Sequence, residues 1–330
     1  MLVLTANLAL VQTAPGQSTA DVSVPSAGFV YDAQAMAVRP VMGARGAALL
    51  GRPLDLGFPV ATAGIAAHQK FLLVSSAGDH RVRVVRFHNT GTTTQIIEGA
   101  LTSPDRVIVS RSGGAAILHS QSTARLQVIT GLPDSPVVAR EFTTADLGSI
   151  AGNPAISDSG ELVLFIGGDH GIHSVWLLDV ENGASRLGLP DSTTLASFRP
   201  DSRDALAITR NGELYVIGPR GAISHFGFIG RGDQTGAAVG VQLSPDGTRA
   251  YVAYSQGDLV IVDSNSGAPN MISCRCIPSG LNTTNSSTMF RLNEPLPGLP
   301  LFFLDASSAV PRVWFVPPDQ SQTDSQGSGQ

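Results

Sequence analysis

The sequence predicts an all-β fold, a β-propeller built from four-stranded antiparallel blades. Three observations predict it. The 330 residues contain 36 glycines and 21 prolines, which interrupt the chain too often for long helices. Short apolar runs rich in β-branched residues lie between these breaks, as expected for strands. The runs recur with a period of about 45 residues, which is the length of one propeller blade.

The clearest copy of the repeat spans residues 239–273 and predicts four strands. The turn Ser244-Pro245-Asp246-Gly247 joins the first two strands, because proline pre-sets φ and glycine accepts a positive φ. One small twisted sheet cannot bury both of its faces, so the copies are expected to stack around an axis. The four runs are Val239 to Leu243, Ala250 to Tyr254, Leu259 to Asp263 and Asn270 to Ser273.

Further copies of the repeat align on that turn. Ser157-Asp158-Ser159-Gly160 and Arg199-Pro200-Asp201-Ser202 each precede an apolar run in the same way, and successive turn aspartates are 43 and 45 residues apart. Weaker copies lie at residues 68–70, at residues 111–113 and around Asn293. The inner pair of strands therefore occurs six times, which predicts six blades.

The two ends of the repeat predict how the ring closes. Runs that match the third strand occur seven times, and the first and last are Phe29 to Tyr31 and Val313 to Val316. Residues 28–41 then form the outer half of a blade, and the last blade, which ends near Pro317, lacks its outermost strand. An N-terminal strand that completes the last blade removes the open sheet edges. We therefore expect six blades with N-terminal strand closure, and seven blades are the alternative.

The N-terminal segment resembles a secretory signal peptide that lacks its basic region. Met1 to Val11 is apolar apart from a short interruption, and Ser18 and Ala20 match the −3 and −1 positions of a cleavage site. Residues 1–20 are therefore a predicted signal peptide, residues 21–317 a single propeller domain and residues 318–330 a disordered tail. No other stretch reaches the ~18 apolar residues of a membrane helix. We expect a soluble monomer exported to the periplasm or the extracellular space.

The Ser-Pro-Asp-Gly turn followed by Tyr251-Val252-Ala253-Tyr254 resembles the repeats of the bacterial YVTN and WD40-like (PD40) propellers. This superfamily includes lactonase-like and TolB-like propellers. The resemblance covers most of residues 28–317 and is best at residues 239–273. It implies a ring of four-stranded sheets. Because members of the superfamily bind proteins, bind ligands or catalyse unrelated reactions, it implies no catalytic residue.

Three consecutive blades place a histidine near one predicted rim, and two of these histidines follow a Gly-Asp pair. Neutral imidazoles that converge with carboxylates are typical ligands of a zinc-like divalent metal ion. Independent, solvated loop residues are the alternative, because blades splay radially and Gly-Asp also makes a hairpin turn. The candidate metal ligands are His80, His119 and His170, with Asp79, Asp169 and His173.

The two cysteines, Cys274 and Cys276, are too few to staple a chain of this length. In an extended strand their side chains point to one face, where a disulfide between them would be strained. We expect a buried thiol pair or an incidental pair on an outer strand, and a redox or intermolecular role is the alternative. A structural zinc site needs four ligands, and no second cysteine pair exists.

The composition limits the classes of function. A net charge of −5 with 14% charged residues excludes a strongly basic nucleic-acid-binding protein. No Gly-x-Ser-x-Gly, His-Glu-x-x-His or EF-hand motif occurs, so no catalytic motif is recognisable, and no cofactor other than the divalent metal is expected. We expect a binding or scaffold module that holds a protein or polymer partner through its rim loops. The alternative is a metal-assisted hydrolase or lactonase-like enzyme at the channel mouth.

The character of the central channel distinguishes these two functions. A polar channel lined by histidines favours an enzyme. A channel of small residues with an apolar patch on the rim favours a binding partner.

Overall fold

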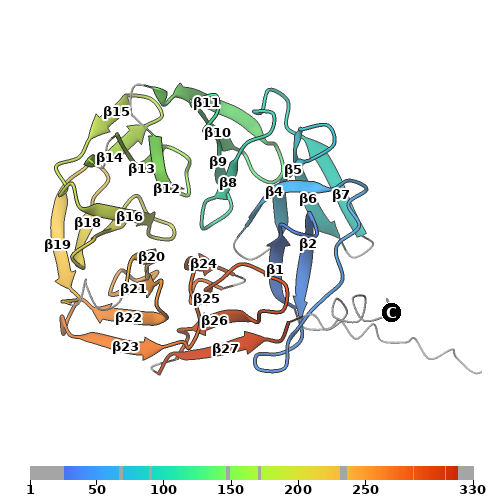
Figure 1. The fold of residues 1–330 in the computed structure, drawn as a ribbon. Coiled ribbons are helices and arrows are strands. Elements are labelled where there is room, and N and C mark those ends of the chain that lie inside the picture. Colours follow the sequence, from blue (N-terminus) through green and yellow to red (C-terminus); the bar gives the residue numbers. More distant parts are fainter. Residues whose placement is uncertain are drawn as a thin grey trace, which may run out of the picture.

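The computed structural model describes residues 26–66, 70–88, 91–145, 149–169, 172–230, 236–284, 286–308 and 310–318. Within these ranges the regular elements are 27 β-strands. They form seven antiparallel sheets around a central axis, so the described chain is a seven-bladed ring (Figure 1). None of these residues belongs to a helix that is long and apolar enough to cross a membrane.

Six of the sheets are four-stranded blades made from strands that are consecutive in the chain, with the first strand nearest the axis. The second, third and fourth blades contain β4 (Val60–Ile65), β5 (Phe71–Ser76), β6 (Val82–His88) and β7 (Gly91–Ile96), then β8 (Arg106–Val109), β9 (Ala115–Ser120), β10 (Arg125–Thr130) and β11 (Val137–Thr143), then β12 (Ser149–Ile156), β13 (Leu162–Asp169), β14 (Ile172–Asp179) and β15 (Gly183–Arg186). The fifth, sixth and seventh contain β16 (Thr193–Phe198), β17 (Ala205–Thr209), β18 (Glu213–Ile217) and β19 (Ile223–Phe228), then β20 (Ala238–Leu243), β21 (Arg249–Tyr254), β22 (Asp258–Asp263) and β23 (Pro269–Ser273), then β24 (Asn282–Thr283), β25 (Met289–Arg291), β26 (Leu301–Asp305) and β27 (Arg312–Val316).

The two ends of the ring carry different connections. We call the end with the turns between the first and second strands of these six blades face I. The opposite end, with the connections between their second and third strands, is face II. Each fourth strand also runs toward face II, because neighbouring strands in a blade are antiparallel.

The first blade has three described strands, β1 (Ser26–Asp32), β2 (Ala37–Met42) and β3 (Leu49–Leu50). Its β1–β2 turn lies on face II beside the start of β4, where the Val60 N–H donates to the Met36 carbonyl at 2.7 Å. The Tyr31 hydroxyl donates to the Val60 carbonyl at 3.0 Å. β1 therefore runs in the direction of the second strands of the other blades. Among the described strands of this blade it is nearest the axis, so Phe29 and Tyr31 line the channel.

The structure confirms the all-β propeller and corrects the number of blades, because seven is right and six is wrong. The error arose at the two ends of the repeat. Phe29 to Tyr31 lie in the innermost described strand of a separate blade and are not a third strand. Val313 to Val316 belong to β27, the outermost strand of a complete last blade. N-terminal strand closure is therefore wrong for the described residues, because each sheet comes from one continuous segment.

Seven clusters of buried apolar side chains hold the ring together, and each cluster joins two neighbouring blades. The period of two along a strand explains this arrangement. In β9, Ala116 and Leu118 pack against the second blade, whereas Ala115 and Ile117 pack against the fourth. Strands buried on both faces need continuous apolar runs, which the sequence shows. The seventh cluster, which contains Phe303, closes the ring by packing the last blade on the first.

The two cysteines form a disulfide, with their Cα atoms 5.1 Å apart. The expectation of a buried thiol pair is therefore wrong, and so is the premise that both cysteines lie within an extended strand. β23 ends at Ser273, and Arg275 has a φ of +52°. This left-handed residue turns the chain so that the two sulfurs meet.

Two predictions fall on residues that the structure leaves undescribed. The predicted signal peptide, residues 1–20, and the predicted tail, apart from Pro318, lie outside the described residues.

Candidate functional site

A channel of about 660 Å³ runs along the axis of the ring. All seven blades contribute to its wall, mainly through their innermost strands. The wall is made largely of small and polar residues, and none of the described residues that line it is a histidine. Its small residues include Ala63, Gly64, Gly152, Ala196 and Gly240.

The Arg111 side chain crosses this channel at face I. It starts from the turn between β8 and β9, and its Nη1 donates to Gln242 Oε1 in the sixth blade. Its Nη2 donates to the Ser287 carbonyl in the seventh blade at 3.2 Å. Gln242 also accepts a hydrogen bond from the Ser197 hydroxyl at 3.0 Å and donates to the Leu281 carbonyl at 3.1 Å. The third and sixth blades are on opposite sides of the axis, so this network bridges the channel.

Burial lowers the pKa of Arg111 to about 10, although the nearby charges of Asp158 and Asp201 act in the opposite direction. The guanidinium therefore remains charged at neutral pH. It also lies 5.9 Å from the centroid of the Phe290 ring, an arrangement that stabilises a cation. A partly buried cation with these partners is bound within the protein, so we assign Arg111 a structural role that bridges the channel at face I.

The predicted repeat turns lie on the same face, and the turn of Asp158 is bonded to the turns of both neighbouring blades. Asp158 accepts the Ser112 N–H of the preceding blade and the Asp201 N–H of the following blade, both at 2.6 Å. Asp246 accepts the Thr248 N–H of its own turn at 3.1 Å. These carboxylates therefore satisfy backbone donors, and their role on face I is structural.

His80 and Asp79 lie in the β5–β6 turn of the second blade, on face II. His80 is exposed, and its Nδ1 shares a hydrogen bond with the Ser103 hydroxyl at 2.8 Å. Asp79 forms an ion pair with Arg83, whose hydrogen bonds hold the pKa of the Asp79 carboxyl well below its usual range. Both predicted metal ligands thus have partners within the protein.

His119 is a core residue of the third blade. It lies in β9 and is only 1% exposed. Burial, together with the positive charge of Arg106, lowers the pKa of its imidazole. Its buried Nδ1 has no hydrogen-bond partner among the described residues. His173 is half-buried in β14, and its Nδ1 also has no partner there.

The remaining two predicted ligands are not fully described. His170 lies outside the described residues, and Asp169 is placed only as the last residue of β13. Within the described part of the chain, no group of three or more His, Cys, Asp or Glu side chains is placed to hold a metal ion. The described residues do not bring the six predicted ligands together, and because His170 is not placed, the metal site stays a prediction.

We predict that His119 lowers the stability of the protein at acid pH. Because its pKa is lowered, the buried imidazole gains its proton at a lower pH in the folded state than in the unfolded chain, where the ordinary pKa is 6.5. The unfolded state then binds more protons, so the free energy of unfolding falls as the pH drops below that value, by up to about 1.4 kcal/mol per pH unit. Urea unfolding between pH 5 and pH 8 measures this effect. The free energy of unfolding of His119→Leu should change less steeply with pH than that of the wild type.

The matched control for this prediction is His80→Gln, because His80 is exposed in the neighbouring blade. Its slope should equal that of the wild type. A His119→Leu protein that keeps the wild-type slope would contradict the assignment of the acid sensitivity to this imidazole.

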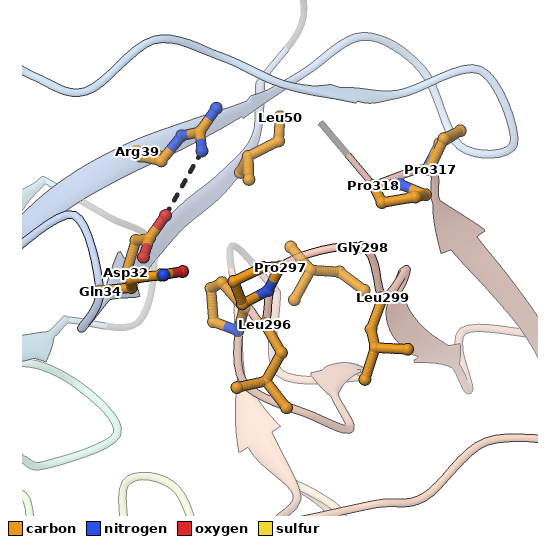
Figure 2. Close-up of a pocket in the computed structure, with 12 residues that line it drawn as sticks. Asp32, Gln34, Arg39, Leu50, Leu296, Pro297, Gly298, Leu299, Pro317 and Pro318 are labelled. Carbon is orange, nitrogen blue, oxygen red and sulfur yellow. Dashed lines mark hydrogen bonds and ion pairs between the residues drawn. The ribbon is translucent and has the colours of Figure 1, made fainter. Parts of the chain in front are cut away.

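A small hollow of about 30 Å³ lies on face II between the first and seventh blades (Figure 2). One wall contains the buried ion pair of Asp32 and Arg39, whose charged atoms are 3.3 Å apart. The opposite wall is the connection between β25 and β26, of which residues 295–300 are here called the leucine–proline loop. Its Leu296 and Leu299 are 57% and 53% exposed. The junction of these blades therefore presents apolar side chains to solvent.

The leucine–proline loop is closed at its base by Asn293. The Asn293 Nδ2 donates to the Pro300 carbonyl at 3.0 Å, and the Phe302 N–H donates to Asn293 Oδ1 at 2.7 Å. Pro295 and Pro297 restrict φ within the loop. The two leucines are therefore presented on a constrained backbone, which reduces the entropy that binding would remove.

The repeat pattern did not predict this surface, and it marked only the segment around Asn293, as a weaker copy of the repeat. The usable signal was the segment Pro295-Leu296-Pro297-Gly298-Leu299-Pro300 itself. Its prolines exclude a central strand, so its leucines have no sheet face to pack on.

No protein-family model and no curated protein sequence matches the chain. Solved structures do match its fold. Hydrazine synthase from Kuenenia stuttgartiensis is similar with 12% identity and a TM-score of 0.52, over 93% of this chain and 100% of that chain. A functionally unknown protein from Desulfotomaculum acetoxidans is similar with 13% identity and a TM-score of 0.59, over 88% and 99% of the two chains. A protein from Lactobacillus plantarum is similar with 12% identity and a TM-score of 0.60, over 89% and 96%.

Identities this low carry information about the fold and none about activity. Together with the order of the seven sheets, these likenesses show that the chain is a seven-bladed β-propeller.

Proposed function

We propose that this propeller is a binding module for a protein partner and that the leucine–proline loop on face II is its contact surface. The observation that carries the proposal is the exposure of Leu296 and Leu299, two leucines that are each more than half exposed on a constrained loop. Fully burying a leucine side chain is worth about 1.5–3 kcal/mol, so a partner that covers both gains substantial binding energy. Exposed apolar groups gathered on one loop of a rigid scaffold are typical of an interaction site.

The rest of the ring supports the same function. Face I is held by internal hydrogen bonds of Arg111 and Asp158, which leaves fewer groups free for a partner there. The described channel wall has no histidine and many small residues, as expected for a scaffold. The side chains that face the hollow on face II are mainly leucine and proline, and the charges of Asp32 and Arg39 neutralise each other. A partner with an extended apolar segment fits this surface.

Finer features of the proposal rest on sequence patterns. The repeat at residues 239–273 supports placing the protein among the YVTN and WD40-like propellers. The apolar segment Met1 to Val11 with the Ser18–Ala20 cleavage pattern supports export to the periplasm or extracellular space. The partner is then a protein of the cell envelope, which a monomeric propeller binds through its rim.

The first step of the test is site-specific crosslinking in the source cells. A photoreactive phenylalanine analogue at position 299 should crosslink to a partner, which mass spectrometry then identifies. The same analogue at position 265 is the matched control, because Asn265 is exposed on face I in the β22–β23 turn. Equal products at the two positions, or none at position 299, would contradict the proposal.

The second step measures affinity with the purified partner. Replacing both leucines by aspartate removes their apolar contacts and places two charges at the interface, so the Kd should rise at least about tenfold. Asn265→Asp should change the Kd by less than about twofold. An unchanged Kd for the Leu296→Asp/Leu299→Asp protein would show that the partner binds elsewhere on the ring.

A further inference from the structure

The Cys274–Cys276 disulfide lies on face II, at the junction of the sixth and seventh blades. Cys274 directly follows β23, and its N–H donates to the Gly257 carbonyl in the β21–β22 turn at 2.8 Å. A single residue, Arg275, separates the two cysteines, so the S–S bond closes a very small loop. Neither cysteine lines the channel or the hollow beside the leucine–proline loop.

The two cysteines differ in exposure. Cys274 is 5% exposed and belongs to the apolar cluster between the sixth and seventh blades. Cys276 is only partly buried, and it lies between the exposed residues Arg275 and Ile277, the latter 81% exposed. Thiol–disulfide exchange requires a thiolate to reach one sulfur. Because Cys276 is the more exposed of the two cysteines, we assign the attack of a thiolate from solution to Cys276 Sγ.

The buried sulfur is the one prepared to leave as a thiolate. The Cys276 N–H donates a hydrogen bond to Cys274 Sγ at 3.2 Å. A hydrogen bond to the charged form of a group stabilises that form, and a better-stabilised leaving thiolate leaves faster. The exposed Arg275 adds a positive charge on the same loop, which also favours a thiolate. Cys276 is therefore the cysteine that a thiolate attacks, and Cys274 is the cysteine that leaves.

The backbone of the loop favours opening of the disulfide. Arg275 has a φ of +52°, a conformation that costs free energy in a residue with a Cβ atom. Reduction of the disulfide allows this residue to relax. Gly257 holds the loop closely, because a Cβ atom there would lie 2.6 Å from the Cys276 carbonyl oxygen. The loop is thus kept in place while one of its residues is strained.

The geometry points to a thiol–disulfide exchange site at which this protein oxidises a dithiol, either a cysteine pair of another protein or a small dithiol. A substrate thiolate attacks Cys276 Sγ, which forms a mixed disulfide and releases Cys274 as a thiolate. The second substrate thiol, as its thiolate, attacks the substrate sulfur of the mixed disulfide and releases Cys276. The substrate leaves as a disulfide, its two electrons reduce the cysteine pair, and its two thiol protons end on Cys274 and Cys276.

The site is tested first on the wild-type protein, with the full chain in native buffer. Reduced glutathione is added, free thiols are alkylated at acid quench, and the products are digested with trypsin. Trypsin cleaves after Arg275 and therefore separates the two cysteines into different peptides. Glutathione should be found on Cys276 and the alkyl group on Cys274. Glutathione found mainly on Cys274, or an intact disulfide after an hour in 1 mM dithiothreitol, would overturn the proposal.

Variants test the roles of the individual residues. The remaining Cys276 of Cys274→Ser should react with iodoacetamide at least about tenfold faster than the remaining Cys274 of Cys276→Ser, and equal rates would overturn the assignment. Arg275→Gly relieves the left-handed strain, so its disulfide should be about tenfold harder to reduce at equilibrium with dithiothreitol. Arg275→Lys keeps both the strain and the charge and should match the wild type. An equilibrium for Arg275→Gly equal to that of the wild type would overturn the role of strain.

Discussion

Phe303→Ala is expected to lower the free energy of unfolding by about 3–5 kcal/mol, the usual cost of truncating a buried phenylalanine. Phe303 is 1% exposed, and its ring stacks on Trp314 with the centroids 4.4 Å apart. It lies in the cluster that packs the seventh blade on the first. The substitution leaves a cavity at the interface that closes the ring. Urea unfolding followed by tryptophan fluorescence measures the loss, because Trp314 is one of only two tryptophans.

Phe315→Ala is the matched control for this prediction. Phe315 lies on the adjacent strand β27 but is 55% exposed, so its truncation should cost less than about 1 kcal/mol. Equal losses in the two variants would show that packing of Phe303 does not close the ring. A loss confined to Phe303→Ala supports closure by packing of the last blade on the first, in place of the expected N-terminal strand closure.

The propeller architecture could be predicted because its cause is local. Turn residues and apolar runs recur with the blade, and the turns at Asp158, Asp201 and Asp246 lie together on face I as their alignment implied. The number of blades could not be predicted in the same way. Alternating apolar residues show that a strand is buried, but they do not give its position within a sheet. Phe29 to Tyr31 and Val313 to Val316 were therefore placed one or more strands from their true positions.

The contacts at the candidate sites depend on residues far apart in the chain. Arg111 bonds to Gln242 and Ser287, which are 131 and 176 residues away, and no local pattern encodes such a pairing. His119 was expected at a rim, but every residue of β9 is buried, so its side chain lies in the core. The disulfide was missed for a related reason. An extended strand was expected at Cys274, whereas β23 has already ended there and Arg275 adopts a left-handed conformation.

Gly240→Ala is the second substitution expected to have a large effect, with a loss of about 3 kcal/mol in the free energy of unfolding. A Cβ atom at Gly240 would lie 2.4 Å from both the Cβ atom and the backbone nitrogen of Leu281, in the next blade. Backbone atoms cannot move aside as a flexible side chain can. The substitution must therefore separate the first strand of the sixth blade from the segment that enters the seventh.

The same displacement should weaken the network at face I, because the Leu281 carbonyl accepts the Gln242 hydrogen bond and Gln242 in turn accepts from Arg111. Gly188→Ala is the control. Gly188 has an ordinary φ, and a Cβ atom there would meet nothing within 4 Å. The free energy of unfolding of Gly188→Ala should therefore differ from that of the wild type by less than about 0.5 kcal/mol. A large loss for Gly240→Ala alone ties the cost to close packing of the inner strands. Equal small changes in both variants would contradict that packing and the bridged channel that depends on it.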